Sequence, residues 1–445
     1  MIFIILFYFF IYSYMDSYFI VGGKELEGEV EVDSAKNALL PIIAGCILVD
    51  GEIKLENVPK YSDVLAMCKI IEHLGGKTKF INGSYINQDL YLDCRNIVYS
   101  DVPNELACCV RSSIFTLGSI LGRKKLAKVS YPGGCDIGLR PIDIHLAGIR
   151  QLGCKVVDKN GYIYANASKL KANDVMLSFP SVGATENIMM LAVFAEGETR
   201  IFNPAKEPEI VDLQNFLNSC GAMISGAGGN IIAIKGVKKL HGCEYKTISD
   251  RIEAGTFMIA GAMCGKQIVI KNADAQHNQE LISKLLKTTC KLTCYDDKII
   301  VEKADKLVSF GEVETAVYPG FPTDLQAPMS SLAAISEGYS LIIENLFESR
   351  YKHIGELMKM GCDIRCKNGV CIIKGKDKIY GAEVVAPDLR GGAALVLAGL
   401  VAEGYTTINN IGLIDRGYYK IEDKLTRLGA DIKRIECEKR MDNCN

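Results

Sequence analysis

The chain has 445 residues, which is more than one simple hydrophobic core accommodates, so two domains are expected. Hydrophobic residues make up 49% and charged residues 23% of the chain, as is typical of globular enzymes. The net charge of -2 excludes a general attraction to nucleic acid or to anionic membranes. Any anionic ligand must therefore be held by locally placed Lys and Arg side chains.

The first 14 residues, MIFIILFYFFIYSY, are apolar and aromatic. They are fewer than the roughly 20 residues of a membrane span, and they lack the basic region and cleavage site of a signal peptide. Met15 then begins MDSYFIVGG, which is typical of a cytosolic start. We favour a tail outside the fold (residues 1–14), added by an upstream start codon, over a membrane anchor, and expect a cytoplasmic protein.

A helix ending in Leu-Gly-Gly-Lys or a variant, followed by a strand, recurs six times. Its copies begin at residues 74, 152, 219, 288, 360 and 428. The interval of roughly 70 residues indicates six repeated units, each with alternating strands and helices. In the first copy we expect Ser62 to cap the helix at its start and Gly75 at its end. The fourth copy has Thr289 in place of the glycine, so that helix end is expected to differ.

A second helix in each unit is rich in alanine and apolar on all sides, as in residues 37–48 and 391–404. Helices of this kind are buried, so the sheets are expected outside them. We therefore predict an α/β fold of two inside-out α/β barrel domains, each built from three βαβαββ-like units. The expected domains are residues 36–248, and residues 15–35 with 249–445, with the active site in the cleft between them.

The 17 cysteines form no CxxC pair, and none of the five histidines forms HxxxH. Pairs such as Cys290/Cys294 and Cys362/Cys366 have the wrong spacing for a zinc site. We therefore interpret the cysteines as reduced thiols and expect no metal.

One cysteine stands out in the segment YPGGCDIGLRPID, residues 131–143. Gly133 and Gly134 let the chain bend and approach a ligand closely. Arg140 behind Cys135 favours the thiolate and binds anions. The pattern predicts a thiol that donates a proton or attacks an electrophile beside a bound phosphate or carboxylate.

Charged and polar residues also precede the expected buried helices, whose free N–H groups attract anions. They are Lys36 and Asn37, Arg111, Ser181-Val182-Gly183, Asp250-Arg251, Thr323-Asp324, and Asp388 with Arg390.

At these motifs the chain resembles the enolpyruvyl transferases, over about residues 19–434. The motifs that carry the resemblance are SAKNALLP at 34, PGGCDIGLRPID at 132, SVGATENIMM at 181, EPEIVDLQNFL at 207, DRIEAGTF at 250, FPTDLQ at 321, FESRY at 347, APDLRGGAALVLAG at 386 and IDRGYYKIEDKL at 414. The resemblance implies two inside-out α/β domains. It also implies transfer of the enolpyruvyl group of phosphoenolpyruvate to the 3-hydroxyl of UDP-N-acetylglucosamine, with release of phosphate, in peptidoglycan synthesis. No organic cofactor, nucleic acid or obligatory membrane partner is implied.

The resemblance further implies the roles of individual residues. Cys135 protonates the donor and forms a covalent adduct, which makes it the expected target of fosfomycin, and Asp324 is the general base. The expected phosphoenolpyruvate-binding residues are Lys36, Arg140, Arg350, Arg390 and Arg416, with Lys36 and Arg416 also catalytic. Those for the UDP-sugar are Lys36, Asn37, Arg111, Arg140, Pro141, Ile142, Asp143, Ile144, Ser181, Val182, Gly183, Asp324, Leu346 and Phe347. Asp388 is expected to order the site through Arg390.

Two alternatives remain. The shikimate-pathway enolpyruvyl transferase shares the fold and the donor but lacks the cysteine loop. A catalytically silent, regulatory paralogue that binds the UDP-sugar should have lost Cys135, Asp324 or an arginine, yet all are present.

Overall fold

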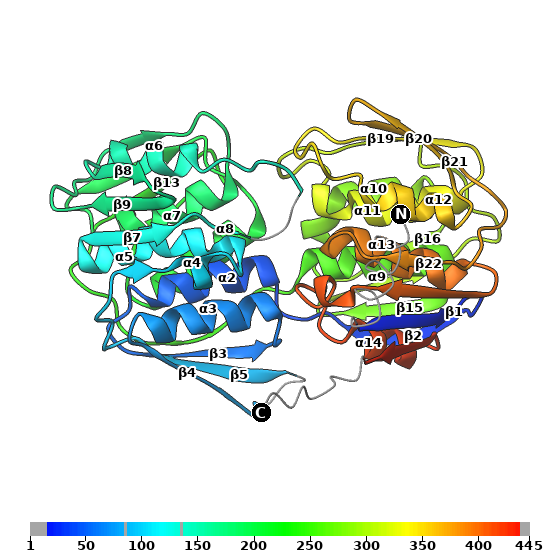
Figure 1. The fold of residues 1–445 in the computed structure, drawn as a ribbon, viewed down its shortest axis with the longest axis horizontal. Helices are drawn as coiled ribbons and strands as arrows, with labels where there is room; N and C mark the ends of the chain where they lie inside the picture. The colour runs from blue at the N-terminus through cyan, green and yellow to red at the C-terminus, as the bar shows by residue number, and fades with distance from the viewer. Residues whose placement is uncertain (1–15, 84–86, 134–136, 437–445) are drawn as a thin grey trace, which may run out of the picture.

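The computed structural model describes residues 16–83, 87–133 and 137–436. Within them, six four-stranded sheets are distributed over two lobes that lie side by side (Figure 1). The prediction of an α/β fold with repeated units is confirmed.

All six sheets share one topology: the first strand is parallel to the second, and the other neighbours are antiparallel. In the first lobe the orders are β14 (Glu244–Lys246), β3 (Glu52–Val58), β5 (Gln88–Asp93), β4 (Lys77–Ile81); β6 (Asp101–Val102), β7 (Leu126–Ser130), β9 (Tyr162–Asn166), β8 (Lys155–Lys159); and β10 (Asp174–Met176), β11 (Glu198–Phe202), β13 (Ile231–Lys235), β12 (Met223–Ser225).

The second lobe repeats this arrangement. Its orders are β2 (Leu26–Glu31), β15 (Gly265–Lys271), β17 (Lys298–Glu302), β16 (Lys291–Cys294); β18 (Glu312–Glu314), β19 (Tyr339–Ile343), β21 (Val370–Lys374), β20 (Asp363–Lys367); and β22 (Glu383–Val385), β23 (Tyr405–Asn409), β1 (Ser17–Val21), β24 (Asp431–Ile435).

Each unit contributes one inner helix, and most residues of these helices are buried. The inner helices are α2 (Lys36–Cys46), α5 (Thr116–Lys124), α7 (Val182–Ala192), α9 (Arg251–Cys264), α11 (Gln326–Ile335) and α13 (Leu389–Val401). They pack on one another within each lobe because they are apolar all round, as expected.

The other helices are amphipathic or short. They are α3 (Ser62–His73), α4 (Asn104–Ala107), α6 (Asp143–Gln151), α8 (Pro208–Ser219), α10 (Gln279–Leu286), α12 (His353–Lys359), α14 (Ile421–Arg427), and the 3₁₀ turns η1 (Arg111–Phe115), η2 (Ala275–Asn278), η3 (Thr323–Leu325) and η4 (Ile411–Leu413).

Two details of the repeat differ from expectation. Ser62 is the first residue of α3 rather than its cap, and no side chain caps that helix. Thr289 has a φ of 70°, in the left-handed region that Gly75 and Gly153 also occupy in their units. The backbone at the fourth helix end therefore matches the other units, and the side chain accommodates it.

The hydrophobic core is divided in two. One cluster draws its residues from 35–240, and the other from 18–32 and 252–432. The chain crosses between the lobes at residues 32–35 and 247–250, where the Ala35 N–H donates to the Ile248 carbonyl and the Asp250 N–H to the Asp33 carbonyl, both at 2.8 Å. We propose domain limits at these paired crossings, as residues 36–248 and residues 15–35 with 249–445.

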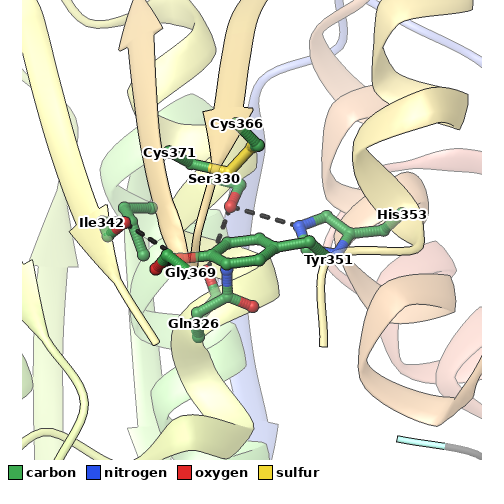
Figure 2. Close-up of a disulfide and its surroundings, with 8 residues drawn as sticks. All are labelled: Gln326, Ser330, Ile342, Tyr351, His353, Cys366, Gly369 and Cys371. Carbon is green, nitrogen blue, oxygen red and sulfur yellow. Dashed lines mark hydrogen bonds between the residues drawn. A yellow bond between two sulfur atoms is a disulfide. The ribbon is translucent and has the colours of Figure 1, made fainter. Parts of the chain in front are cut away.

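The interpretation of the cysteines as reduced thiols is wrong for Cys366 and Cys371, which form a disulfide between β20 and β21 (Figure 2). The two residues face each other in the antiparallel register, with Cα atoms 4.1 Å apart. A search for CxxC spacing could not find them, because the strand pairing, and not the spacing, brings them together.

No helix in the described ranges is long and apolar enough to cross a membrane. The 14-residue N-terminal tail lies outside the described residues.

Candidate active site

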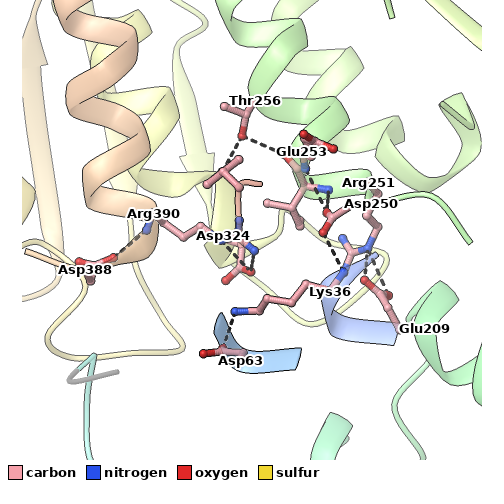
Figure 3. A network of polar contacts seen from close by, with 12 residues as sticks. Lys36, Asp63, Glu209, Asp250, Arg251, Glu253, Thr256, Asp324, Asp388 and Arg390 are labelled. Atoms are coloured by element: carbon pink, nitrogen blue, oxygen red, sulfur yellow. Dashed lines mark hydrogen bonds and ion pairs between the residues drawn. The ribbon is translucent and has the colours of Figure 1, made fainter. Parts of the chain in front are cut away.

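Asp324 is held between two arginines of the second lobe. It lies in η3, just before α11, and accepts hydrogen bonds from Arg390 Nε and Nη2 at 3.2 and 2.8 Å and from Arg350 Nη2. Figure 3 shows Arg390 reaching Asp324 from the start of α13. Burial alone would raise the pKa of Asp324, but Arg390 and Arg350 outweigh it and hold that pKa well below its usual range. The carboxylate is therefore ionised and paired.

The two arginines have donor capacity left over. Arg390 is 3% and Arg350 is 4% exposed, and Arg390 Nη1 and Arg350 Nε have no hydrogen-bond partner among the described protein atoms. Because an unpaired buried N–H is costly, these groups suit an anion with several acceptor oxygens.

The start of α13 explains how Arg390 is positioned. Asp388 caps this helix, because its Oδ1 accepts the N–H groups of Arg390 and Gly391, both at 3.0 Å. The cap fixes the backbone from which the guanidinium extends, and Arg390 also stacks over the Tyr418 ring at 5.2 Å.

Lys36 and Arg416 meet at a carboxylate that the sequence analysis did not select, that of Asp63. Lys36 Nζ lies 3.0 Å from Asp63 Oδ2, and Arg416 Nε lies 2.9 Å from Asp63 Oδ1. Burial, together with Arg390 and Arg416, lowers the pKa of Lys36 despite its pairing with Asp63. Figure 3 shows Lys36 extending from α2 to Asp63 in the first turn of α3. Because Arg416 belongs to the second lobe, Asp63 connects the two lobes.

A second ion pair joins the lobes nearby. Arg251 at the start of α9 donates from Nε to Glu209 Oε1 of α8 at 3.0 Å. The preceding residue, Asp250, caps α9 and also accepts the Lys36 backbone N–H at 3.1 Å. The starts of α2 and α9 are thus tied together across the lobe boundary (Figure 3).

A third group of residues gathers where α6 and α7 begin in the first lobe. Arg111 donates to the backbone oxygen of Arg140, and burial with Arg140 lowers the pKa of Arg111 to about 10. His145 stands in the first turn of α6, and burial together with Arg111 and Arg140 lowers its pKa to about 3. A Cβ on Gly183 would come within 2.9 Å of His145 Cε1, so only glycine fits here without a shift.

The segment around Arg140 contacts the second lobe. The Arg140 guanidinium lies 5.6 Å from the centre of the Phe347 ring, and the Arg350 guanidinium lies 5.8 Å from the centre of the same ring. The Leu139 N–H donates to Glu348 Oε1 at 2.9 Å, and the Ser349 N–H to the Ile137 carbonyl at 3.2 Å. These contacts place the first-lobe loop beside the residues that hold Asp324.

The structure thus brings together many of the expected residues. Asp324, Arg350 and Arg390 form one cluster, Lys36 and Arg416 a second, and Arg111, Arg140 and Phe347 a third. The other expected residues lie at helix starts or in the loop after β19: Asn37, Pro141, Ile142, Asp143, Ile144, Ser181, Val182, Gly183 and Leu346. Cys135 lies outside the described residues.

The sequence analysis did not select Asp63 or His145 as site residues, and it did not predict the contact between Glu209 and Arg251. Asp63 stands in the first turn of an outer helix, and that position was a usable signal. The lobe-to-lobe pairing was not readable, because 353 positions separate Asp63 from Arg416.

The chain is similar to known proteins over nearly its whole length. Residues 20–425 match the family model described as EPSP synthase (3-phosphoshikimate 1-carboxyvinyltransferase). The chain is 48% identical to UDP-N-acetylglucosamine 1-carboxyvinyltransferase 2 of Caldanaerobacter subterraneus subsp. tengcongensis, covering 95% of this chain and 100% of the relative. It is 43% identical to the protein of the same name from Bacillus subtilis, covering 94% and 97%.

Solved structures with low sequence identity share the fold. The enolpyruvyl transferase NikO from Streptomyces tendae superposes with a TM-score of 0.83 at 22% identity, over 94% of this chain and 99% of that one. EPSP synthase from Acinetobacter baumannii superposes with a TM-score of 0.72 at 18% identity, over 94% of this chain and 100% of that one.

The fold is that of an enolpyruvyl transferase. The chain belongs to the enolpyruvyl transferase family, and within it to the group of transferases named UDP-N-acetylglucosamine 1-carboxyvinyltransferase.

Proposed function

We propose that this protein transfers the enolpyruvyl group of phosphoenolpyruvate to the 3-hydroxyl group of UDP-N-acetylglucosamine and releases phosphate, at the first committed step of peptidoglycan synthesis. The observation that carries the assignment of the site is the carboxylate of Asp324, held between two buried arginines that retain unpaired donors. A base beside an anion-binding site is what addition of a hydroxyl group to phosphoenolpyruvate requires.

The donor carries a phosphate and a carboxylate, so it needs cations at both ends. We assign the carboxylate to Arg350 and Arg390, and the phosphate to Lys36, Arg140 and Arg416. Bidentate guanidinium groups suit both ends. The UDP-sugar is assigned to the first-lobe residues at the starts of α2, α6 and α7, together with Arg111, Leu346 and Phe347.

In the addition step, Asp324 takes the proton of the sugar hydroxyl, whose oxygen bonds to C2 of phosphoenolpyruvate. Cys135 supplies the proton that C3 gains. In the elimination step, C3 loses a proton and the C2–O bond to phosphate breaks, which leaves the enolpyruvyl ether.

The pairing of Asp324 has a consequence for this sequence of events. Two arginines lower the pKa of Asp324 and make it a weak base. A substrate carboxylate that binds Arg350 and Arg390 competes for their N–H groups, and the basicity of Asp324 then rises when the donor is in place.

The test is phosphate release from phosphoenolpyruvate, with and without UDP-N-acetylglucosamine, for the wild type and Cys135→Ala. We expect release that depends on the sugar nucleotide and collapses in the variant. Shikimate 3-phosphate in place of the sugar nucleotide tests the sister activity. Absence of release in the wild type, with the sugar nucleotide still bound, would instead support a silent paralogue.

A further inference from the structure

Two cysteines of the first lobe face each other without being bonded. Cys220 follows the last residue of α8, and Cys243 directly precedes β14. Their Sγ atoms are 3.4 Å apart. A disulfide bond is about 2.05 Å long, so the two sulfur atoms need to approach by only about 1.4 Å. We infer that Cys220 and Cys243 form a redox-active dithiol, which small disulfide compounds such as glutathione disulfide oxidise to an intramolecular disulfide.

The two thiols differ in access to solvent. Cys243 is partly exposed, whereas Cys220 is fully buried, with 0% of its surface exposed. An oxidant from solution can therefore reach Cys243 first, and Cys220 can attack only after that. This is the arrangement of a reactive thiol with a resolving thiol behind it.

Their contact also differentiates their reactivity. The hydrogen bond between the sulfur atoms lowers the pKa of Cys243, and the same bond together with burial raises that of Cys220. Since the thiolate is the nucleophile in disulfide exchange, Cys243 is the attacking group.

Three other thiols, those of Cys46, Cys94 and Cys109, lack one of these properties. Cys46 and Cys94 are fully buried, with 0% of their surface exposed. Burial raises the pKa of both thiols, and it raises the pKa of Cys94 to about 12. Cys109 is exposed, but burial of the sulfur and the neighbouring Cys108 raise its pKa.

The reaction balances as thiol–disulfide exchange. The Cys243 thiolate attacks one sulfur of glutathione disulfide, which releases one glutathione thiolate and leaves a mixed disulfide on Cys243. Cys220 then loses its proton and attacks the Cys243 sulfur, which releases the second glutathione. Two protein thiols are oxidised, and one glutathione disulfide is reduced to two glutathione molecules.

The disulfide would link α8 and β14, two elements that hydrogen bonds already join. Asp212 of α8 accepts the Tyr245 hydroxyl of β14 at 2.6 Å and the Ile248 N–H at 3.2 Å. Ile248 belongs to the 247–250 crossing between the lobes. A Cys220–Cys243 disulfide would add a covalent link between the end of α8, about 16 Å along the helix from Glu209, and the start of β14, the strand that leads into this crossing.

The experiment uses the full-length protein with the Cys366–Cys371 disulfide intact, treated with glutathione disulfide, then alkylated and digested without reduction. We expect a cross-linked peptide pair containing Cys220 and Cys243, and an intact mass lower by two hydrogens. Absence of this pair, or preferential pairing of either cysteine with Cys46, would overturn the inference. The wild-type peptide map decides this without any variant.

Two variants test the order of attack. Cys220→Ser is expected to accumulate one glutathione on Cys243, because the resolving thiol is missing. Cys243→Ser is expected to leave Cys220 unmodified, because that thiol is buried. The variant Cys108→Ser, at an exposed cysteine, serves as the control and should form the Cys220–Cys243 bond as the wild type does. Equal glutathione incorporation in Cys220→Ser and Cys243→Ser would contradict the assigned roles.

Discussion

Asp63 of the first lobe and Arg416 of the second form a hydrogen-bonded ion pair, with Arg416 Nε 2.9 Å from Asp63 Oδ1. Lys36 shares the same carboxylate at 3.0 Å. Asp63 thus sets the positions of two cations assigned to the substrate phosphate, and it does so across the lobe boundary.

We expect Asp63→Ala to lower kcat/KM for phosphoenolpyruvate by about 10- to 100-fold, which corresponds to roughly 1.4–2.8 kcal/mol. Without Asp63, Lys36 and Arg416 repel each other and lose their fixed positions. Steady-state kinetics measures the effect. The control is Asp174→Ala, which removes an exposed pair with Arg200 in the same lobe and should leave the kinetics unchanged. Equal kinetics for Asp63→Ala and wild type would refute this role.

Asp324→Asn should reduce kcat by about 10²- to 10⁴-fold, the usual contribution of a general base. It also leaves Arg350 and Arg390 without their charged partner, so the melting temperature should fall. Asp324→Glu separates the two effects, because it keeps a carboxylate for the arginines but displaces it from the hydroxyl. We expect Asp324→Glu to retain most of the stability and to lose most of the rate; a variant that keeps its kcat would exclude Asp324 as the base.

Asp212 should make stability depend on pH. Burial raises its pKa from 3.8 to about 6 in the folded protein, despite hydrogen bonds from Tyr245 and Ile248. The folded state therefore binds this proton more tightly than the unfolded state. The resulting stabilisation is fully present below about pH 3.8 and is lost as the pH rises through about 6.

The check is urea unfolding of wild type and Asp212→Asn at several pH values. As the pH rises from about 4 to 6, the free energy of unfolding of the wild type should decline relative to that of the variant. The slope should be at most about 1.4 kcal/mol per pH unit. Parallel pH curves for the two proteins would rule out the raised pKa.

Thr289 should be a site where glycine stabilises the protein. Its φ of 70° is unfavourable for a β-branched residue, and such strain costs about 1–3 kcal/mol. Its hydroxyl recovers part of this by donating to the Lys306 carbonyl at 2.7 Å. We expect Thr289→Gly to raise the free energy of unfolding by about 1 kcal/mol without changing kcat.

The matched control for Thr289→Gly is the reverse substitution in another unit. Gly153→Thr places a side chain at a φ of 81°, with a Cβ 2.6 Å from the Lys169 carbonyl oxygen, and should destabilise. If Thr289→Gly destabilises as well, the hydrogen bond to Lys306 outweighs the backbone strain.

The repeated units, the buried alanine-rich helices and the helix starts that carry functional groups were all readable from the sequence. They depend on local periodicity, on glycine at left-handed helix ends and on residue types at fixed spacing. Lys36, Asp324 and Arg390 were predicted as site residues for this reason, because each lies at or beside the start of a buried helix.

The tertiary structure decided which of these residues meet. The pairs Asp63–Arg416 and Glu209–Arg251 join different lobes, and the Cys220–Cys243 contact and the Cys366–Cys371 disulfide depend on which elements pack and in what register. Local propensity carries no information about such partners. They are set by burial of the two cores and by the crossings at residues 32–35 and 247–250, which fix how the lobes face each other.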